Sequence, residues 1–285
     1  RGFMGKTVKW ICVCAALCAA VSGWAVWSNQ SVVQTEYMLE SDRVPQAFNG
    51  FRIAQVSDLH NRQMGKNNKN LLAMLTACRP DIIVFTGDMI DSRQTEIEVT
   101  VRFAREAVKI APCYYVPGNH ESRLTEYAEF KQELLDAGVT VLEDAAVAIE
   151  RSGARILLQG MVDPAFRTDD ILLHMDETVR AQLESLPKED AFTVLLSHRP
   201  ELFPQYKDHS ADLVFTGHAH GGQIRLPWIG GLYTPSQGWF PEYDAGSFTE
   251  QGVTMIVSRG VGNSAFPLRV NNRPEVVVVE LTHKA

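Results

Sequence analysis

Side chains able to bind metal ions or to move protons follow short apolar runs at five places along the chain. They are Asp58, His60, Asp88, Asn119, His120, His198, His218 and His220. The set offers imidazole nitrogens with carboxylate and amide oxygens but no thiolate, a mixture that suits Mn, Fe, Zn or a similar divalent ion. It holds too many ligands for one tetrahedral ion, whereas two ions about 3.5–4 Å apart that share a carboxylate would use them economically.

The pair His218 and His220 organises this set. It follows the apolar run 213–215, which predicts a buried strand, and it precedes two glycines that let the backbone pass close to a bound group. Taken singly, each member has a simpler explanation, because a lone Asp at a strand end is commonly a turn or cap residue. Open α/β sheets bind ligands beyond the carboxyl ends of their strands, so the repetition at five strand ends indicates a shared crevice.

The elements that must position these residues alternate between strand and helix. Apolar runs predict strands over residues 51–56, 82–85, 113–116, 193–196 and 213–215. Helical spacing of apolar residues predicts helices over 67–78, 95–110, 124–136 and 168–186. Further strands are expected at 37–39, 139–142, 147–150, 155–159, 253–257 and 276–281. The alternation indicates one α/β domain with additional antiparallel pairing in its second half.

The composition is that of a globular protein with a large core. The 285 residues are 45% hydrophobic and 21% charged. The formal net charge of -7 and the absence of a basic run argue against nucleic acid as a partner. Anionic substrates remain compatible with this charge, because bound metal ions can dominate the local field. The cysteines lack the spacing of a zinc ribbon or a disulfide framework, so Cys78 and Cys113 are expected to be small buried apolar residues.

The segment near the N-terminus predicts a membrane anchor. Residues 10–27 carry no charge, and this length is close to the minimum that spans a bilayer as a helix. Basic residues precede the run and acidic residues follow it, which predicts an N-terminus in the cytoplasm and a catalytic domain outside it. A cleaved signal peptide, giving a secreted or cell-wall protein, and a buried soluble helix are the alternatives.

The expected division is an anchor or signal over 1–30, a linker with a first strand over 31–50, and one domain over 51–285. The first residue is Arg rather than Met, so the sequence is expected to be a fragment or to carry added residues.

The five clusters read, in order, Asp58-Leu-His60, Gly87-Asp88, Gly118-Asn119-His120-Glu121, His198 and Gly217-His218-Ala-His220. In order and relative spacing they resemble the signature of the calcineurin-like metallophosphoesterases, and the resemblance extends over residues 51–281. The stretches 217–227 and 258–264 are similar to the membrane-associated bacterial branch of that family. This branch includes enzymes implicated in cleaving UDP-2,3-diacylglucosamine.

The resemblance implies a fold and a role for each residue. The fold would be a four-layer α/β/β/α sandwich with a di-metal site between two sheets. Asp58, His60 and His220 would hold the first ion, Asn119, His198 and His218 the second, and Asp88 would bridge them. His120 would lie just outside the coordination shell as the catalytic side chain, and Glu121 would support the site. The two divalent ions are expected to be Mn first, with Fe, Zn or Mg compatible.

The chemistry expected from such a centre is hydrolysis of a phosphoester. Two cations lower the pKa of a bridging water, so that hydroxide is available near neutral pH to attack phosphorus. His120 can donate a hydrogen bond or a proton toward the leaving oxygen. The expected substrate is a phosphodiester or pyrophosphate linkage in an envelope lipid or a nucleotide-linked precursor. The rival functions are a generic phosphomonoesterase, a nucleotide phosphodiesterase and a catalytically silent membrane scaffold.

Two aromatic stretches, 227–233 and 237–241, follow the His-x-His pair. They favour either an apolar entrance for a lipid-linked substrate beside the membrane or packing over the second sheet. Arg225 and Arg259 are candidates for phosphate contact, and pairing with surface carboxylates is the alternative for both.

Overall fold

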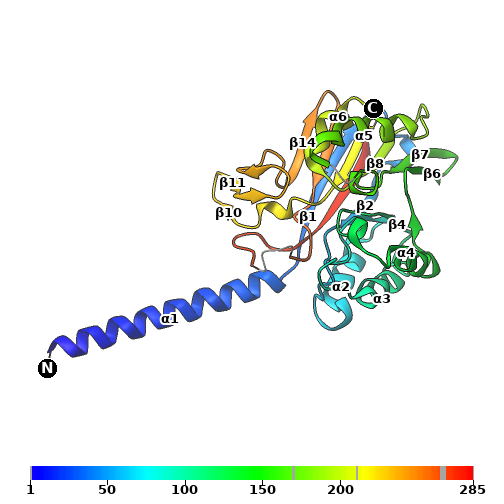
Figure 1. The fold of residues 1–285 in the computed structure, drawn as a ribbon. Coiled ribbons are helices and arrows are strands. Elements are labelled where there is room, and N and C mark those ends of the chain that lie inside the picture. Colours follow the sequence, from blue (N-terminus) through cyan, green and yellow to red (C-terminus); the bar gives the residue numbers. More distant parts are fainter. Residues whose placement is uncertain (1, 169–170, 210, 264–267, 285) are drawn as a thin grey trace.

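The computed structural model describes residues 2–168, 171–209, 211–263 and 268–284. Two six-stranded sheets pack face to face, and helices cover both outer faces (Figure 1). The predicted four-layer α/β/β/α sandwich is therefore confirmed.

The first sheet carries the strands that precede the first three polar clusters. Its order is β1 (Val33–Ser41), β16 (Glu275–His283), β2 (Phe51–Val56), β3 (Ile82–Thr86), β4 (Cys113–Val116) and β5 (Thr140–Val141). β2 to β5 run parallel, β16 is antiparallel to β2, and β1 is parallel to β16. Parallel neighbours end at the same edge, so the residues after β2, β3 and β4 are brought together there.

The second sheet carries the strands that precede the last two clusters. Its order is β14 (Gly246–Glu250), β15 (Val253–Val257), β9 (Leu213–Thr216), β8 (Thr193–Leu196), β7 (Ala154–Gly160) and β6 (Ala145–Arg151). The four central strands are parallel. At the edges, β14 is antiparallel to β15 and β6 is antiparallel to β7. The predicted antiparallel pairing in the second half thus occurs at both edges of this sheet.

Helices on the two outer faces complete the layers. They are α2 (Lys69–Cys78), α3 (Ile97–Ala107) and α4 (Tyr127–Asp136) on the first sheet, with α5 (Ile171–Ser185) and α6 (Phe203–Lys207) on the second. Adjacent residues of each buried strand face opposite layers, as the pleat requires. Ile53 lies between the sheets while Ala54 faces α2 and α3, and Phe215 lies between the sheets while Val214 faces α5 and α6. Burial on both sides explains why these strands read as continuous apolar runs.

Several helix and strand boundaries differ from the predictions by two residues or more. α3 ends at Ala107 rather than at residue 110, because Lys109 and Ile110 bond to carbonyls three residues back in a tighter turn. α4 begins at Tyr127 rather than at residue 124, because Leu124 has an extended backbone after the 3-10 turn Glu121–Arg123. The strand expected over 139–142 is reduced to β5. The helix expected over 168–186 is α5, and residues 169 and 170 lie outside the described residues.

The apolar segment forms one long helix, α1 (Gly2–Gln30), which projects away from the domain (Figure 1). Over Val8–Gln30 it is long and apolar enough to cross a membrane, a property that a signal sequence shares. The alternative of a buried soluble helix is wrong, because nearly all the side chains described from Val8 to Trp27 are exposed. Arg1, counted among its flanking basic residues, lies outside the described residues.

The last turn of α1 is fastened to the domain. Asn29 is buried, and its amide exchanges two hydrogen bonds of 2.9 Å with the backbone of Arg269. Arg273 donates to the carbonyl and hydroxyl of Ser31, and its guanidinium stacks 4.9 Å from the centre of the Trp27 ring. The end of the helix is therefore held by side-chain contacts as well as by the chain itself.

Two small hairpins follow the His-x-His pair. β10 (Arg225–Leu226) pairs with β11 (Gly230–Gly231), and β12 (Tyr233–Thr234) pairs with β13 (Gly238–Trp239). Of the two alternatives stated for their aromatic residues, packing over the second sheet is not the arrangement found. Trp228, Ile229, Tyr233, Trp239 and Phe240 are all exposed. Trp228 lies in the turn between β10 and β11, whereas Tyr233 and Trp239 belong to β12 and β13.

Candidate metal centre

The loops after five strands meet at one edge where the two sheets face each other. β2 supplies Asp58 and His60, β3 supplies Asp88, and β4 supplies Asn119 and His120 from the first sheet. The second sheet supplies the rest, with His198 after β8 and the pair His218 and His220 after β9. All eight are buried, with at most 7% of each residue exposed. The structure thus brings all the predicted site residues into one buried cluster.

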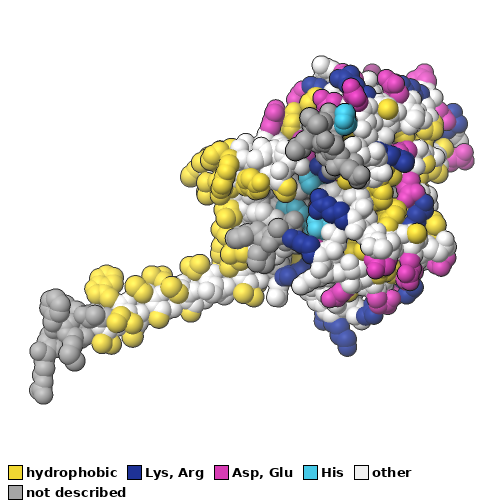
Figure 2. Space-filling model, in the orientation of Figure 1, with side chains coloured by type: hydrophobic (Ala, Val, Ile, Leu, Met, Phe, Trp, Pro, Cys, Tyr) yellow, Lys and Arg dark blue, Asp and Glu magenta, His cyan; other side chains and the backbone are white. Residues whose placement is uncertain are grey.

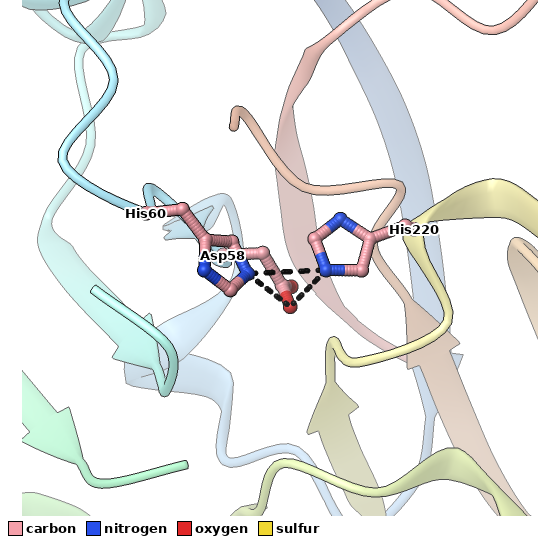
Figure 3. Close-up of side chains that lie close together, drawn as sticks. All are labelled: Asp58, His60 and His220. Carbon is pink, nitrogen blue, oxygen red and sulfur yellow. Dashed lines mark hydrogen bonds and ion pairs between the residues drawn. The ribbon is translucent and has the colours of Figure 1, made fainter. Parts of the chain in front are cut away.

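The first group consists of Asp58, His60 and His220. Their ligand atoms all lie within 4.8 Å of one another. The Nε2 atoms of His60 and His220 are 3.1 Å apart, and both face Oδ1 of Asp58 at 4.0 and 3.3 Å respectively (Figure 3). Two imidazole nitrogens and a carboxylate oxygen converging on one point form a suitable half-site for a divalent ion.

The second group consists of Asp88, His198 and His218, whose ligand atoms also lie within 4.8 Å of one another. Oδ2 of Asp88 is 3.2 Å from Nε2 of His198 and 3.7 Å from Nε2 of His60. This carboxylate therefore lies between the two groups, where a bridging ligand would be needed.

Three buried polar atoms in the cluster have no hydrogen-bond partner among the described residues. They are Nδ1 of His60, Oδ1 of Asn119 and Nε2 of His198. The other ring nitrogen of His198, Nδ1, is 2.7 Å from the carbonyl oxygen of Thr86 and donates to it. In the neutral ring this bond places the lone pair on Nε2, the nitrogen that faces Asp88. Buried polar groups are normally paired, so the unpaired atoms together with the mixed N/O donor set fit divalent ions.

Burial sets the protonation of the histidines. Burial lowers the pKa of His60 to about 3, and it lowers the pKa values of His218 and His220 well below the ordinary value. These three imidazoles are therefore neutral near pH 7 and can offer a lone pair. Burial disfavours charge on His198 as well, but the nearby Asp88 carboxylate raises its pKa to about 10. An ion bound between His198 and Asp88 would take the place of that proton.

The backbone of the cluster is held in an unusual conformation. Five of its non-glycine residues have a positive φ between 45° and 63°, in the left-handed region that costs energy for residues with a Cβ. They are Asp58, His60, Asp88, His218 and His220. Such strain persists only where the surroundings enforce it, and it is common at functional sites.

Glycines allow the loops to approach each other closely. A Cβ added at Gly217 would lie less than 3.0 Å from the hydroxyl of Ser57 and the carboxylate of Asp58. A Cβ added at Gly118 would lie equally close to Asp88. Both glycines stand in the predicted motifs, and their role is to make room for the neighbouring carboxylates.

His120 and Glu121 occupy different positions beside the cluster. Nδ1 of His120 accepts a hydrogen bond of 3.1 Å from the backbone N–H of Ser92, so its proton lies on Nε2. Glu121 is fully buried and accepts hydrogen bonds from the backbone N–H groups of Asp88, Ile90 and Gly118. Burial raises the pKa of Glu121 to about 7. Glu121 ties the loops after β3 and β4 together, which agrees with the supporting position predicted for it.

Three residues near the cluster were missed by the sequence analysis. Asp91 lies 3.6 Å from Nδ1 of His120, Ser236 lies 2.8 Å from Nε2 of His218, and Arg269 lies 3.3 Å from Nδ1 of His220. Asp91 follows Asp88 by three residues, so proximity to the Gly-Asp motif was an available signal. Ser236 and Arg269 stand in loops without any local pattern, and only the tertiary fold brings them close.

The two arginines proposed for phosphate contact are both paired with carboxylates. Arg225 lies 3.0 Å from Asp244, and Arg259 forms an ion pair with the buried Glu275. The alternative stated for them, pairing with carboxylates, is the arrangement found.

Residues 51–222, more than half of the chain, match the family described as Calcineurin-like phosphoesterase. The chain belongs to this family. It is therefore a hydrolase of phosphoester bonds, and its His/Asp groups are able to hold the metal ions of a di-metal centre.

Several proteins of this kind are similar to the chain over most of its length. The metallophosphoesterase YkuE of Bacillus subtilis is 28% identical over 91% of this chain and 89% of its own. The phosphodiesterase YaeI of Escherichia coli is 29% identical over 81% and 82%. The UDP-2,3-diacylglucosamine pyrophosphatase LpxG of Chlamydia muridarum is 25% identical over 99% of both chains.

The calcineurin-like fold also appears among solved structures. The chain resembles the protein TT1561 of Thermus thermophilus with a TM-score of 0.50 and 13% identity, over 75% of this chain and 91% of that one. This likeness concerns the fold alone.

Proposed function

We propose that the protein is a di-metal hydrolase that cleaves a phosphodiester or pyrophosphate bond in a lipid-linked or nucleotide-linked substrate. The observation that carries the proposal is the position of Asp88, whose carboxylate lies between two groups of His and Asp ligands. In this proposal Asp58, His60 and His220 hold one ion and Asp88 is shared. The second ion is held by Asn119, His198 and His218.

The chain's own residues would divide the work as follows. Divalent ions bound there lower the pKa of water and neutralise the charge of phosphoryl oxygens. Asp88 keeps the two half-sites at a fixed separation, because its Oδ1 also accepts a hydrogen bond of 2.8 Å from the backbone of His120. The neutral imidazoles present lone pairs without adding positive charge, so the cluster can bind cations.

His120 is the proposed catalytic side chain. Its Nδ1 is engaged by Ser92, which directs the Nε2 proton away from that loop. Burial lowers the pKa of His120, so it acts as a neutral hydrogen-bond donor near pH 7. A donor fixed before reaction stabilises charge that develops on a phosphoryl or leaving oxygen.

The substrate class and the location rest on the helix and the relatives. α1 is able to span a membrane over Val8–Gln30, and basic residues precede its uncharged stretch 10–27 while acidic residues follow the helix. We propose an anchor over residues 1–30, a linker and first strand over 31–50, and a domain over 51–285 that lies outside the cytoplasm. The LpxG relatives carry the name of a pyrophosphatase acting on a diacylated sugar nucleotide, which supports a lipid-linked pyrophosphate.

The first test is a metal-dependent hydrolase assay on the full chain. The protein is stripped of metal, resupplied with Mn, Zn or Mg, and assayed with bis-p-nitrophenyl phosphate and p-nitrophenyl phosphate. We expect diester cleavage that depends on added metal, strongest with Mn, and that Asp88→Asn loses. Direct metal analysis should give two ions per chain and fewer in the variant.

Other outcomes would change the proposal. Preference for the monoester would indicate a phosphatase. Two bound ions with no activity on either ester or on UDP-2,3-diacylglucosamine would indicate a binding scaffold. Activity that survives Asp88→Asn would exclude the shared carboxylate from the mechanism.

A further inference from the structure

The hairpins β10–β11 and β12–β13 expose an unusual apolar surface, here called the hairpin patch. It consists of Leu226, Trp228, Ile229, Tyr233, Trp239 and Phe240, which are between 38% and 102% exposed. Residues 226–241 contain no Asp, Glu, Lys or Arg. A large uncharged apolar surface on a protein marks a place of contact with a partner or a membrane.

Two of these aromatic residues have a strained backbone conformation. Trp228 and Phe240 have φ values of 65° and 55°, in the left-handed region that costs energy for large side chains. Their turns are closed by backbone hydrogen bonds, from Ile229 to Leu226 at 3.2 Å and from Phe240 to Leu232 at 2.9 Å. A strained turn that points a fully exposed Trp at solvent indicates a contact surface.

The hairpin patch lies on the side of the domain from which α1 departs (Figure 1). Figure 2 shows hydrophobic side chains gathered over these hairpins and along the helix, on the same side of the molecule. The end of α1 is fixed to the domain through Asn29 and Arg273, so the orientation of the patch relative to the helix is defined. A bilayer crossed by α1 would therefore meet the hairpins at its surface.

The patch is also joined to the metal centre. Ser236, between β12 and β13, lies 2.8 Å from Nε2 of His218 and accepts a hydrogen bond of 3.2 Å from Arg199. Gly222, at the end of the turn that carries His220, leaves no room for a Cβ against Gly231 of β11. Histidine side chains are visible in Figure 2 beside the patch, between it and a group of Lys and Arg.

We propose that the hairpin patch docks in the interfacial layer of the lipid bilayer that α1 crosses, and so holds the metal centre at the membrane surface. The occupant is lipid rather than protein because the patch is rich in Trp and Tyr, lacks charge, and continues the apolar surface of α1. Trp and Tyr favour the level of the lipid headgroups. The inference deepens the proposed function and rests on it, because a docked site would take phosphoester headgroups from lipids without removing the acyl chains.

The first experiment measures depth in the membrane with the full chain in lipid nanodiscs. The chain has five Trp residues, and replacing Trp10, Trp24 and Trp27 of α1 by Phe leaves only Trp228 and Trp239 to fluoresce. We expect lipids brominated near the headgroup end of the acyl chain to quench this emission more than lipids brominated at the tail end. Emission equal to that in unbrominated nanodiscs would overturn the proposal.

The second experiment measures catalysis. Trp228→Ser combined with Trp239→Ser should slow hydrolysis of UDP-2,3-diacylglucosamine in vesicles about tenfold, because two apolar contacts with lipid are lost. Hydrolysis of soluble bis-p-nitrophenyl phosphate should be unchanged. Leu135→Ser, which removes an exposed apolar side chain from α4, is the matched control and should affect neither rate.

The outcomes separate the docking proposal from the proposed function. Equal loss on both substrates would assign the aromatic residues to the fold or the site and overturn docking. A parent protein that cleaves neither substrate, yet shows quenching by headgroup-end bromine, would sink the hydrolase proposal and retain the docking.

Discussion

The loops of the metal centre and the aromatic hairpins share a left-handed backbone conformation, but it serves opposite purposes in the two regions. Both hold non-glycine residues at positive φ, among them Asp58 and His218 in the centre and Trp228 and Phe240 in the hairpins. The centre encloses these residues completely, whereas the hairpins present them to solvent. A strained backbone thus orients a side chain in either case, and the surroundings decide whether that side chain is buried in the cluster or exposed to solvent.

The sharpest test of this comparison is a matched pair of glycine substitutions. Gly217→Ala should lower the free energy of unfolding by about 3 kcal/mol and weaken metal binding, because its methyl group collides with Ser57 and Asp58. Gly238→Ala has open space in the hairpin but a φ of 75°, so we expect a cost of about 1–2 kcal/mol with metal binding unchanged. Urea unfolding and metal titration of both variants provide the measurement. Equal metal affinity in the two variants would break the comparison.

The second prediction asks whether the centre contributes a hydrogen-bond donor beyond its proposed ligands. His120→Ala should lower kcat by about 10²–10³ with two metal ions still bound, because one preorganised donor is lost. His120→Gln should recover part of the rate, since its amide N–H can reach toward the position of Nε2. The loss should be greater for an alkyl diester than for a nitrophenyl diester, whose leaving group needs less stabilisation. A similar loss for both esters would remove the leaving oxygen as the partner of His120.

The smallest predicted effect is on stability and concerns His209, which lies in neither the metal centre nor the hairpins. It serves as a reference for a buried histidine outside both regions. Its Nε2 is 2.9 Å from Oε1 of Gln159, and burial lowers its pKa to about 4. Below pH 6.5, His209 is protonated in the unfolded chain but stays neutral in the folded protein. The free energy of unfolding therefore falls as the pH falls toward 4. His209→Gln should therefore shrink the loss of unfolding free energy between pH 7 and pH 5 by about 1–2 kcal/mol. Urea unfolding at the two pH values checks this, and parallel profiles for parent and variant would contradict it.

The fold could be predicted because the buried strands carry a strong local signal. Val84 and Phe215 belong to continuous apolar runs that are buried on both faces, and each run stops at a polar cluster. Gly217 and Gly118 could be placed in the site for the same reason. The helix ends were less predictable, because Leu124 has an extended backbone after the turn Glu121–Arg123 although no Gly or Pro separates it from α4.

The residues of the site that could not be predicted depend on contacts between segments that are distant in the sequence. Arg269 reaches His220 from a loop that is close only after β16 and β9 have joined their sheets, and nothing in its local sequence indicates this. The exposure of Trp228 and Trp239 was equally hidden, since aromatic residues suit a core and a membrane surface alike. Local composition identifies such residues as apolar, and only the tertiary fold decides which of them remain uncovered.

The pairing of β1 with β16 has a consequence for how the protein is made. β1 follows α1 directly, yet its parallel partner comes near the other end of the chain, with Val33 opposite Glu275. β16 also separates β1 from β2, so the first sheet cannot close while the chain is still emerging. During synthesis, the edges of β1 and β2 that pair with β16 therefore stay unpaired and prone to misassembly until β16 has left the ribosome. The nascent chain is therefore expected to need protection until its last long strand has been synthesised.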